Sequence, residues 1–180
     1  MVRRQQVVAK LGSLASDMHR NITGNVEELH VAYMPFGDSP EKWIKKTQAE
    51  YEEHMLTQLR LERSIELKRG FTMVGPHRDD LIFSINGQDA KIFASQGQQR
   101  TAVLAYKLAE MELMHQETGE YPVVLLDDVM SELDRSRREF LVEILNKKAQ
   151  TIITTTHLGS FTPDILSDAA IFKIEAGTIV

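Results

Sequence analysis

The first residues of the chain carry helical and then extended patterns of apolar positions. Apolar residues recur every three or four positions near the start, which predicts an amphipathic helix with one buried face. They are Val7, Leu11, Leu14, Met18 and Ile22. Thr23-Gly24-Asn25 ends this helix, residues 28–34 alternate as a half-buried strand does, and residues 35–40 have the Pro, Gly and Asp content of a turn.

A long polar helix is predicted from Glu41 to Arg69. Its apolar stripe is narrow and consists of Ile44, Tyr51, Met55 and Leu59. At about 1.5 Å per residue this helix would be roughly 40 Å long, which is long for a compact domain. Two interpretations fit the pattern: an arm packed against one neighbour, or a surface helix of an ordinary domain.

After Gly70 the pattern becomes that of an α/β protein. Strands are predicted at 81–85 and 91–93 around an Asn86-Gly87 turn, and a helix at about 98–116. Residues 121–126 form a continuously apolar strand of the kind that is buried on both faces of a parallel sheet. A helix with Phe140, Leu141, Ile144 and Leu145 on one side, an apolar strand at 151–154 and a short hairpin at 169–180 complete the pattern. Strand–helix–strand alternation predicts an α/β fold.

Composition narrows the function classes. The chain has no cysteine, which excludes disulfides and thiolate metal sites, and no apolar run approaches a membrane span. We therefore expect a cytoplasmic protein without membrane contact. Residues 1–70 hold 11 Lys/Arg against 10 Asp/Glu, and residues 71–180 hold 10 against 16, so that the first part has a net charge of +1 and the second of −6. Nucleic-acid-binding domains are usually basic, so any DNA contact has to come from local patches.

The most informative motif is an apolar strand that ends in two aspartates. Asp127 and Asp128 follow directly on Val123-Val124-Leu125-Leu126. Open α/β sheets bind ligands at the carboxyl ends of their strands, and adjacent carboxylates repel each other unless a cation or proton neutralises them. A helix N-cap would explain one acidic residue, but Ser136-Arg137-Arg138-Glu139 is predicted to start the next helix as a capping box. The pair therefore favours metal-linked chemistry.

A second motif opens the helix near residue 98. Ser95, Gln96, Gly97 and Gln98 place a hydroxyl and free backbone N–H groups at a helix N-terminus, where the helix dipole favours anions. Ser95 and Gln98 are also the two ends of a capping box, which any well-started helix can have. The motif alone leaves both interpretations open.

Three further segments carry polar groups. Ser131 and Asp134 belong to a polar loop after the acidic strand, and Thr154-Thr155-Thr156-His157 ends the next strand on the same side of the sheet. The segment Gly75-Pro76-His77-Arg78-Asp79-Asp80 is either a metal-ligand group or a salt-bridged turn that joins the long helix to the sheet.

The order of these motifs resembles the second half of an ABC-type ATPase, and most closely the RecF family of DNA replication and repair proteins, relatives of the SMC proteins. The blocks that carry the resemblance are residues 75–81, 95–101 and 125–134. The resemblance implies an ATPase head with a parallel-rich sheet and flanking helices over residues 71–180. It implies a helical arm over residues 1–70.

The resemblance also implies roles for individual residues. Asp127 corresponds to the Walker B acid that holds Mg²⁺, and Asp128 to the group that polarises the attacking water. Ser95, Gln96, Gly97 and Gln98 correspond to the signature loop that contacts ATP on the opposite subunit, although Ala94 and Gln96 depart from the transporter motif Leu-Ser-Gly-Gly-Gln. Ser131 to Asp134 corresponds to the D-loop, and His157, or else Thr156, to the switch residue.

By the same resemblance the partners are double-stranded DNA near single-strand gaps, the proteins RecR and RecO, and a second copy in an ATP-dependent homodimer. A P-loop is missing, because none of the ten glycines is followed by lysine. We therefore expect a C-terminal fragment that neither binds ATP tightly nor hydrolyses it alone. Basic residues of the long helix are candidate phosphate contacts, but interleaved glutamates also make them ordinary helix-face ion pairs; they are Lys42, Lys45, Lys46, Arg60, Arg63, Lys68 and Arg69.

Two alternatives come from other classes. The first is a metal-dependent phosphoesterase or nuclease that uses two acid clusters, made of His77, Asp79, Asp80, Asp127, Asp128 and His157. The second is a non-enzymatic fragment that docks a partner.

Overall fold

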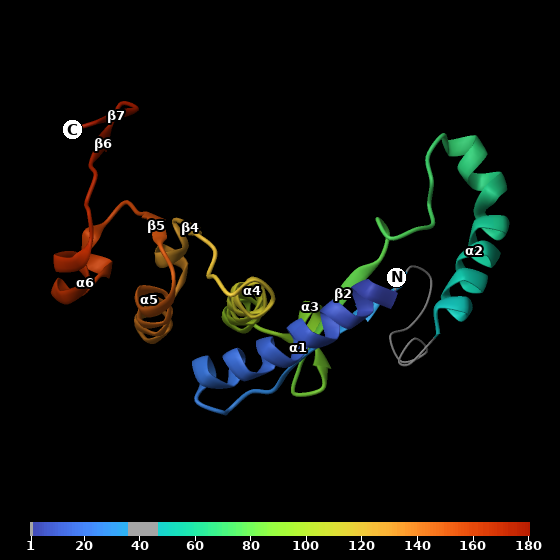
Figure 1. Cartoon of the computed structure of the whole chain (residues 1–180), viewed down its shortest axis with the longest axis horizontal. Helices are drawn as coiled ribbons and strands as arrows, with labels where there is room; N and C mark the ends of the chain where they lie inside the picture. The colour runs from blue at the N-terminus through green and yellow to red at the C-terminus, as the bar shows by residue number, and fades with distance from the viewer. Residues whose placement is uncertain (1, 36–46) are drawn as a thin grey trace. The chain divides into compact units, whose positions relative to one another are not determined.

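The computed structural model describes residues 2–35 and 47–180, and the chain divides into two compact units, residues 1–120 and 121–180. Figure 1 labels most of the helices and strands of both units. Each unit is described by itself below. The predicted α/β fold class is confirmed: helices accompany an antiparallel sheet in the first unit and a parallel strand pair in the second.

Helix α1 (Val2–Thr23) and strand β1 (Leu29–Met34) form where the sequence predicts them. Gly24 and Asn25 both have φ of 64° and end the helix. Helix α1 lies close against β1: a Cβ added to Gly12 would lie 3.1 Å from the carbonyl oxygen of Val31. Glycine at this position lets the helix backbone approach the strand.

The sheet of the first unit has the order β1-β2-β3 with antiparallel pairing, in which β2 is Asp80–Ile85 and β3 is Gln88–Asp89. The Asn86-Gly87 turn is confirmed. The predicted strand at 91–93 is wrong, because Ala90–Phe93 forms the short helix α3. The Asp89 side chain accepts a hydrogen bond from the Lys91 backbone N–H, and this cap starts a helix where the hairpin would otherwise continue.

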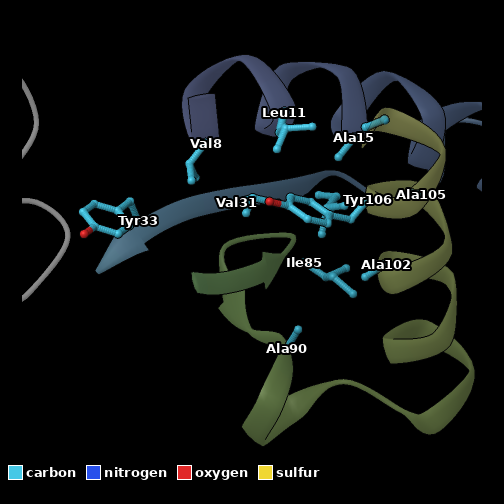
Figure 2. Packing of buried hydrophobic residues seen from close by; sticks show 12 residues of the cluster. Val8, Leu11, Ala15, Val31, Tyr33, Ile85, Ala90, Ala102, Ala105 and Tyr106 are labelled. Atoms are coloured by element: carbon cyan, nitrogen blue, oxygen red, sulfur yellow. The ribbon is translucent and has the colours of Figure 1, made fainter. Parts of the chain in front are cut away.

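Helix α4 (Gln96–Thr118) covers the predicted helix and begins two residues earlier. Its small residues Ala102, Ala105 and Ala109 pack with α1 and β1 in one core cluster. Figure 2 shows this cluster, with Tyr106 among the aliphatic side chains and the Tyr33 hydroxyl pointing away from them. The ring of Tyr106 meets that of Phe83 edge to face at 5.3 Å.

Helix α2 (Gln48–Arg69) is shorter than predicted. Thr47 is its N-cap in an extended conformation and completes a capping box with Glu50, so a helix running unbroken from residue 41 is wrong. The rest of the predicted start, the turn at 36–40 and Lys42, Lys45 and Lys46 lie outside the described residues. At about 1.5 Å per residue α2 is roughly 33 Å long. Tyr51 of the narrow stripe is buried, and its hydroxyl donates a hydrogen bond to Gln5 of α1 at 2.6 Å.

The second unit contains the parallel pair β4 (Val124–Asp127) and β5 (Thr151–Thr154), with α5 (Arg135–Lys148) between them in the chain. Leu141, Val142 and Leu145 of α5 are buried. The prediction that the strand at 121–126 is buried on both faces is wrong, because Leu125 is 71% exposed and its neighbour Ile152 is 55% exposed. Within the described residues the parallel sheet consists of these two strands, and the face that bears Leu125 and Ile152 is exposed.

Shorter elements complete the second unit. They are the 3₁₀ turns η2 (Val129–Glu132) and η3 (Leu158–Ser160), helix α6 (Pro163–Asp168), and the hairpin of β6 (Ile174–Glu175) and β7 (Thr178–Ile179). The predicted hairpin is confirmed, with Ala176-Gly177 between its two strands. Among the described residues no helix is both long and apolar enough to cross a lipid bilayer.

Candidate functional site

The carboxyl ends of β4 and β5 bring polar groups from two strands together. Asp127 is the last residue of β4 and lies opposite Thr154 of β5. The Thr154 hydroxyl donates to Asp127 Oδ1 at 2.6 Å and accepts a hydrogen bond from the Asp128 N–H at 3.1 Å. Both aspartates are exposed, and within the described ranges neither forms an ion pair with a lysine or arginine. Their carboxylates are therefore free of a protein cation.

The backbone of Asp128 is strained. Its φ of 49° lies in the left-handed region, which residues other than glycine, asparagine and aspartate seldom adopt. The Ser131 hydroxyl donates to the Asp128 carbonyl oxygen at 2.9 Å and holds this conformation. The Asp128 side chain makes no capping bond to η2, so its carboxylate is not used as a helix cap. Strained residues cluster at functional sites, which makes Asp128 a stronger candidate.

Asp134 is the N-cap of α5. Its Oδ1 accepts the Arg137 backbone N–H at 2.9 Å, and its Oδ2 pairs with the Arg137 guanidinium. The predicted capping box of Ser136 and Glu139 is therefore wrong: the N-cap lies two residues earlier, and Glu139 pairs instead with Arg135 at 2.8 Å. Ser131 and Asp134 thus define the loop that joins the acidic strand end to α5.

Thr156 and His157 follow β5 and are both exposed. The Thr155 hydroxyl accepts the His157 backbone N–H at 3.2 Å and donates to the His157 carbonyl oxygen at 3.2 Å. This local turn holds the backbone of His157 just beyond the strand end that bears Thr154.

The first unit holds the other candidate group, at the start of α4. Ser95 caps the helix: its hydroxyl accepts the Gln98 N–H at 3.3 Å, and Gln98 Oε1 accepts the Ser95 N–H at 2.9 Å. The predicted capping box is confirmed. Ser95, Gln96 and Gly97 are exposed, while Gln98 is half-buried.

The salt-bridged turn expected over residues 75–80 is also confirmed, and its ion pair joins Asp79 to Arg4 of α1. Gly75 accepts the Arg78 N–H at 2.8 Å. The Asp79 side chain is only 2% exposed; it accepts a hydrogen bond from the Tyr33 hydroxyl and lies 3.7 Å from the Arg4 guanidinium. Arg78 lies over the Phe71 ring at 5.4 Å. Burial and the hydrogen bond to Asp79 raise the pKa of Tyr33 well above its usual range.

A cluster of three or more His, Asp or Glu side chains able to hold a metal ion is absent from the part of the chain that the structure describes. Sequence reasoning gave no role to Thr154, Glu27 or His19. Thr154 was visible as the last residue of an apolar strand, whereas Glu27 and His19 carry no motif.

The parallel strand pair with its acidic end, followed by a capped helix, agrees with the expected second part of an ABC-type ATPase head. No family model matches the chain. Curated proteins named RecF are similar to the chain over nearly all of its length. DNA replication and repair protein RecF of Geobacillus thermodenitrificans is 42% identical over 99% of the chain and 47% of its own length, and RecF of Rippkaea orientalis is 45% identical over 98% and 46%.

Two solved structures are similar as well. They are described as the recombination mediator protein RecF-ATPrS in the RecFOR pathway and the corresponding RecF-ATP structure, with TM-scores of 0.75 and 0.72 and identities of 34% and 35%. Each match covers 98% of this chain and 44% of the solved chain. Over nearly its whole length the chain is similar to proteins named RecF. It spans about half the length of the curated relatives it matches.

Proposed function

We propose that this chain supplies the Walker B, signature and switch residues of a RecF-like ATPase that mediates recombination in DNA repair and replication. The observation that carries the proposal is the pair Asp127 and Asp128 at the carboxyl end of a parallel strand, exposed and without an ion-pair partner among the described residues. Two adjacent carboxylates in this position favour the binding of a cation, which offsets their repulsion.

ATP with Mg²⁺ is the proposed cofactor. The Asp127 carboxylate and the Thr154 hydroxyl are hard oxygen donors 2.6 Å apart, which suits Mg²⁺, an ion that uses one or two carboxylates and keeps several waters. Bound Mg²⁺ would neutralise charge on the phosphates. Asp127 would hold the ion through water, and Asp128 would accept a proton from the attacking water. His157, or Thr156, would sense the phosphate from the same strand end.

Ser95, Gln96 and Gly97 are proposed to contact the γ-phosphate of ATP held by a second copy of the protein. A long helix offers free N–H groups and a positive dipole at this end. A Cβ on Gly97 would find no neighbour nearer than the Ser95 hydroxyl, at 4.0 Å. Packing within the chain therefore does not require glycine here, whereas a phosphate that approaches the backbone does. Ser131 and Asp134 would cross the same dimer interface.

The remaining proposals concern the arm and the partners. Residues 1–70 would form the arm and residues 71–180 the head. Double-stranded DNA near single-strand gaps is the proposed substrate, and RecR and RecO are proposed partners because the similar solved structures belong to the RecFOR pathway. The described basic residues Arg60, Arg63, Lys68 and Arg69 of α2 are exposed. They are available for phosphate contacts.

The decisive experiment uses a chimera in which this chain replaces the matching half of the Geobacillus thermodenitrificans relative. The chimera should bind ATP, dimerise with ATP and turn it over. Asp128→Asn should lower kcat by about 100-fold or more while leaving ATP affinity within about threefold, because asparagine keeps the size and the left-handed backbone but cannot take a proton. The 180-residue chain alone is expected to show no micromolar ATP binding in a titration with labelled nucleotide.

Ser95→Arg should block ATP-driven dimerisation of the chimera, because a large side chain would occupy the space of the phosphate. Ser64→Arg is the matched control: Ser64 is also exposed, but lies on α2. If the Ser95→Arg chimera dimerises at the same ATP concentration as the unsubstituted chimera, the contact across subunits is ruled out.

A further inference from the structure

A chain of polar contacts leads from the start of α4 into the interior of the first unit. Gln98 Nε2 donates to Glu27 Oε1 at 2.9 Å, while Gln98 Oε1 accepts the Ser95 N–H at 2.9 Å. Glu27 Oε2 lies 3.6 Å from His19 Nε2. The His19 side chain is fully buried in α1, and the Glu27 side chain, from the loop before β1, is 17% exposed.

The capping box does not need this extension. Ser95 and Gln98 complete the box between themselves, as Thr47 and Glu50 do at the start of α2. Withdrawing a carboxylate from water costs free energy unless it is paired and hydrogen-bonded. Gln98 donates a hydrogen bond to one Glu27 oxygen, and the other oxygen lies within ion-pair distance of the His19 ring.

Glu27 also decides which way the Gln98 amide faces. A carboxylate only accepts hydrogen bonds, so the amide nitrogen must point to Glu27 and the amide oxygen must point to the Ser95 N–H. Both polar atoms of the Gln98 side chain are then engaged within the chain. Gln98 is thus held in place to shape the turn that carries Ser95 and Gly97, and its amide does not reach outward.

We infer that His19 and Glu27 are positioning residues for the signature turn: buried His19 holds Glu27, Glu27 orients the Gln98 amide, and Gln98 fixes Ser95. The inference rests on the proposed function, because it matters for ATP only if Ser95 and Gly97 contact the nucleotide. The resemblance placed Gln98 among the nucleotide contacts. The inference assigns it a different role, which is to position the residues that make those contacts.

The first test measures the network in the 180-residue chain, by amide hydrogen exchange of Ser95 in NMR spectra. Gln98→Glu keeps an acceptor for the Ser95 N–H but places a second carboxylate against Glu27. Glu27→Leu removes the acceptor for the Gln98 amide. Each should speed exchange at Ser95 about tenfold, the effect of one charge-assisted hydrogen bond.

The double variant Glu27→Gln with Gln98→Glu exchanges donor and acceptor, because the amide introduced at position 27 then donates to the carboxylate introduced at position 98. It should return exchange at Ser95 to within about threefold of the unsubstituted rate. Glu50→Gln in the other capping box is the control, and should leave Ser95 unchanged. His19→Gln, which places an amide group beside Glu27, should preserve slow exchange, whereas His19→Phe, which removes every polar atom at this position, should not.

The second test measures the ATP concentration for half-maximal dimerisation of the chimera. Gln98→Glu should raise it about tenfold, and the double variant should restore it. Exchange at Ser95 that is equal in all variants, or a double variant no better than Gln98→Glu, would overturn the network. If the unsubstituted chimera does not dimerise with ATP, the proposed function fails, and exchange at Ser95 still decides the network by itself.

Discussion

The buried hydrogen bond between Tyr33 and Asp79 gives the sharpest prediction for stability. Tyr33→Phe removes one hydroxyl and leaves the ring, which is 6% exposed at the end of β1. The Asp79 carboxylate, 2% exposed, then loses a donor while remaining near Arg4. A hydrogen bond to a charged group contributes about 1.5–3 kcal/mol, so we expect a loss of about 2 kcal/mol in the free energy of unfolding.

Calorimetry at neutral pH measures the effect. The unit of residues 1–120 should have an unfolding entropy of roughly 0.25 kcal/mol/K, so its Tm should fall by about 8 °C. Tyr106→Phe is the matched control: Tyr106 is 9% exposed, and its hydroxyl makes no hydrogen bond within the described residues, so its Tm should change by about 2 °C or less. Equal shifts in the two variants would refute the reasoning.

The same bond predicts a pH dependence. Burial and Asp79 raise the pKa of Tyr33 in the folded state above that of an unfolded tyrosine, which is about 10. A group whose folded pKa is raised contributes its full stability below the unfolded pKa and loses it as pH rises further. The stability difference between the unsubstituted chain and Tyr33→Phe should therefore be constant from pH 7 to about 9.5 and shrink above pH 10.

Three further predictions test other elements. Asp134→Ala should lower stability by about 1 kcal/mol in urea unfolding, because it removes the cap of α5, while Ser136→Ala should change it by less than about 0.5 kcal/mol; the reverse order would restore the Ser136 capping box. Gly97→Ala should raise helix stability by about 0.5 kcal/mol in the same assay, yet weaken ATP-driven dimerisation of the chimera; unchanged dimerisation would remove the argument for phosphate approach. Leu125→Lys should reduce self-association in sedimentation experiments without lowering Tm, since Leu125 is 71% exposed, and a large loss of Tm would mean that its face is covered.

Apolar periodicity predicted the long elements, because their pattern extends over many residues. Helices α1 and α4 and strands β1 and β5 form where the spacing placed them. It failed where one side chain decides the local structure. Asp89 converts a predicted strand into α3, and Thr47 starts α2 several residues after the polar pattern begins. Neighbouring side chains compete to accept the first backbone N–H groups of a helix, and apolar periodicity does not show which of them forms the cap.

The exposure of β4 shows another limit. A continuously apolar strand predicts cover on both faces, but it does not say which segments provide that cover. Within the described residues α5 and β5 accompany β4, and Leu125 remains exposed. An apolar pattern therefore predicts that a strand is buried, but the described residues cover only part of the surface of β4.

Some residues of the candidate site are neighbours in the sequence, and others are brought together only by the fold. Adjacent aspartates at a strand end are readable from sequence, whereas Thr154 joins them only because β5 pairs in the register Asp127 to Thr154. A slip of one residue would turn the Thr154 hydroxyl to the opposite face. Glu27 reaches Gln98 across 71 positions of sequence, which no local pattern records.

The two candidate groups lie in separate compact units, and this makes their structural effects separable. Asp128 is held by Thr154 and Ser131 within the second unit, and Ser95 by Gln98 and Glu27 within the first. Distant sites without shared partners have additive effects on stability. Asp128→Asn combined with Gln98→Glu should thus be additive in unfolding free energy in the chain alone. In the ATP-bound dimer of the chimera the proposed function brings both groups to nucleotide, so a coupling that appears only with ATP would arise from the shared ligand, not from the fold of the chain.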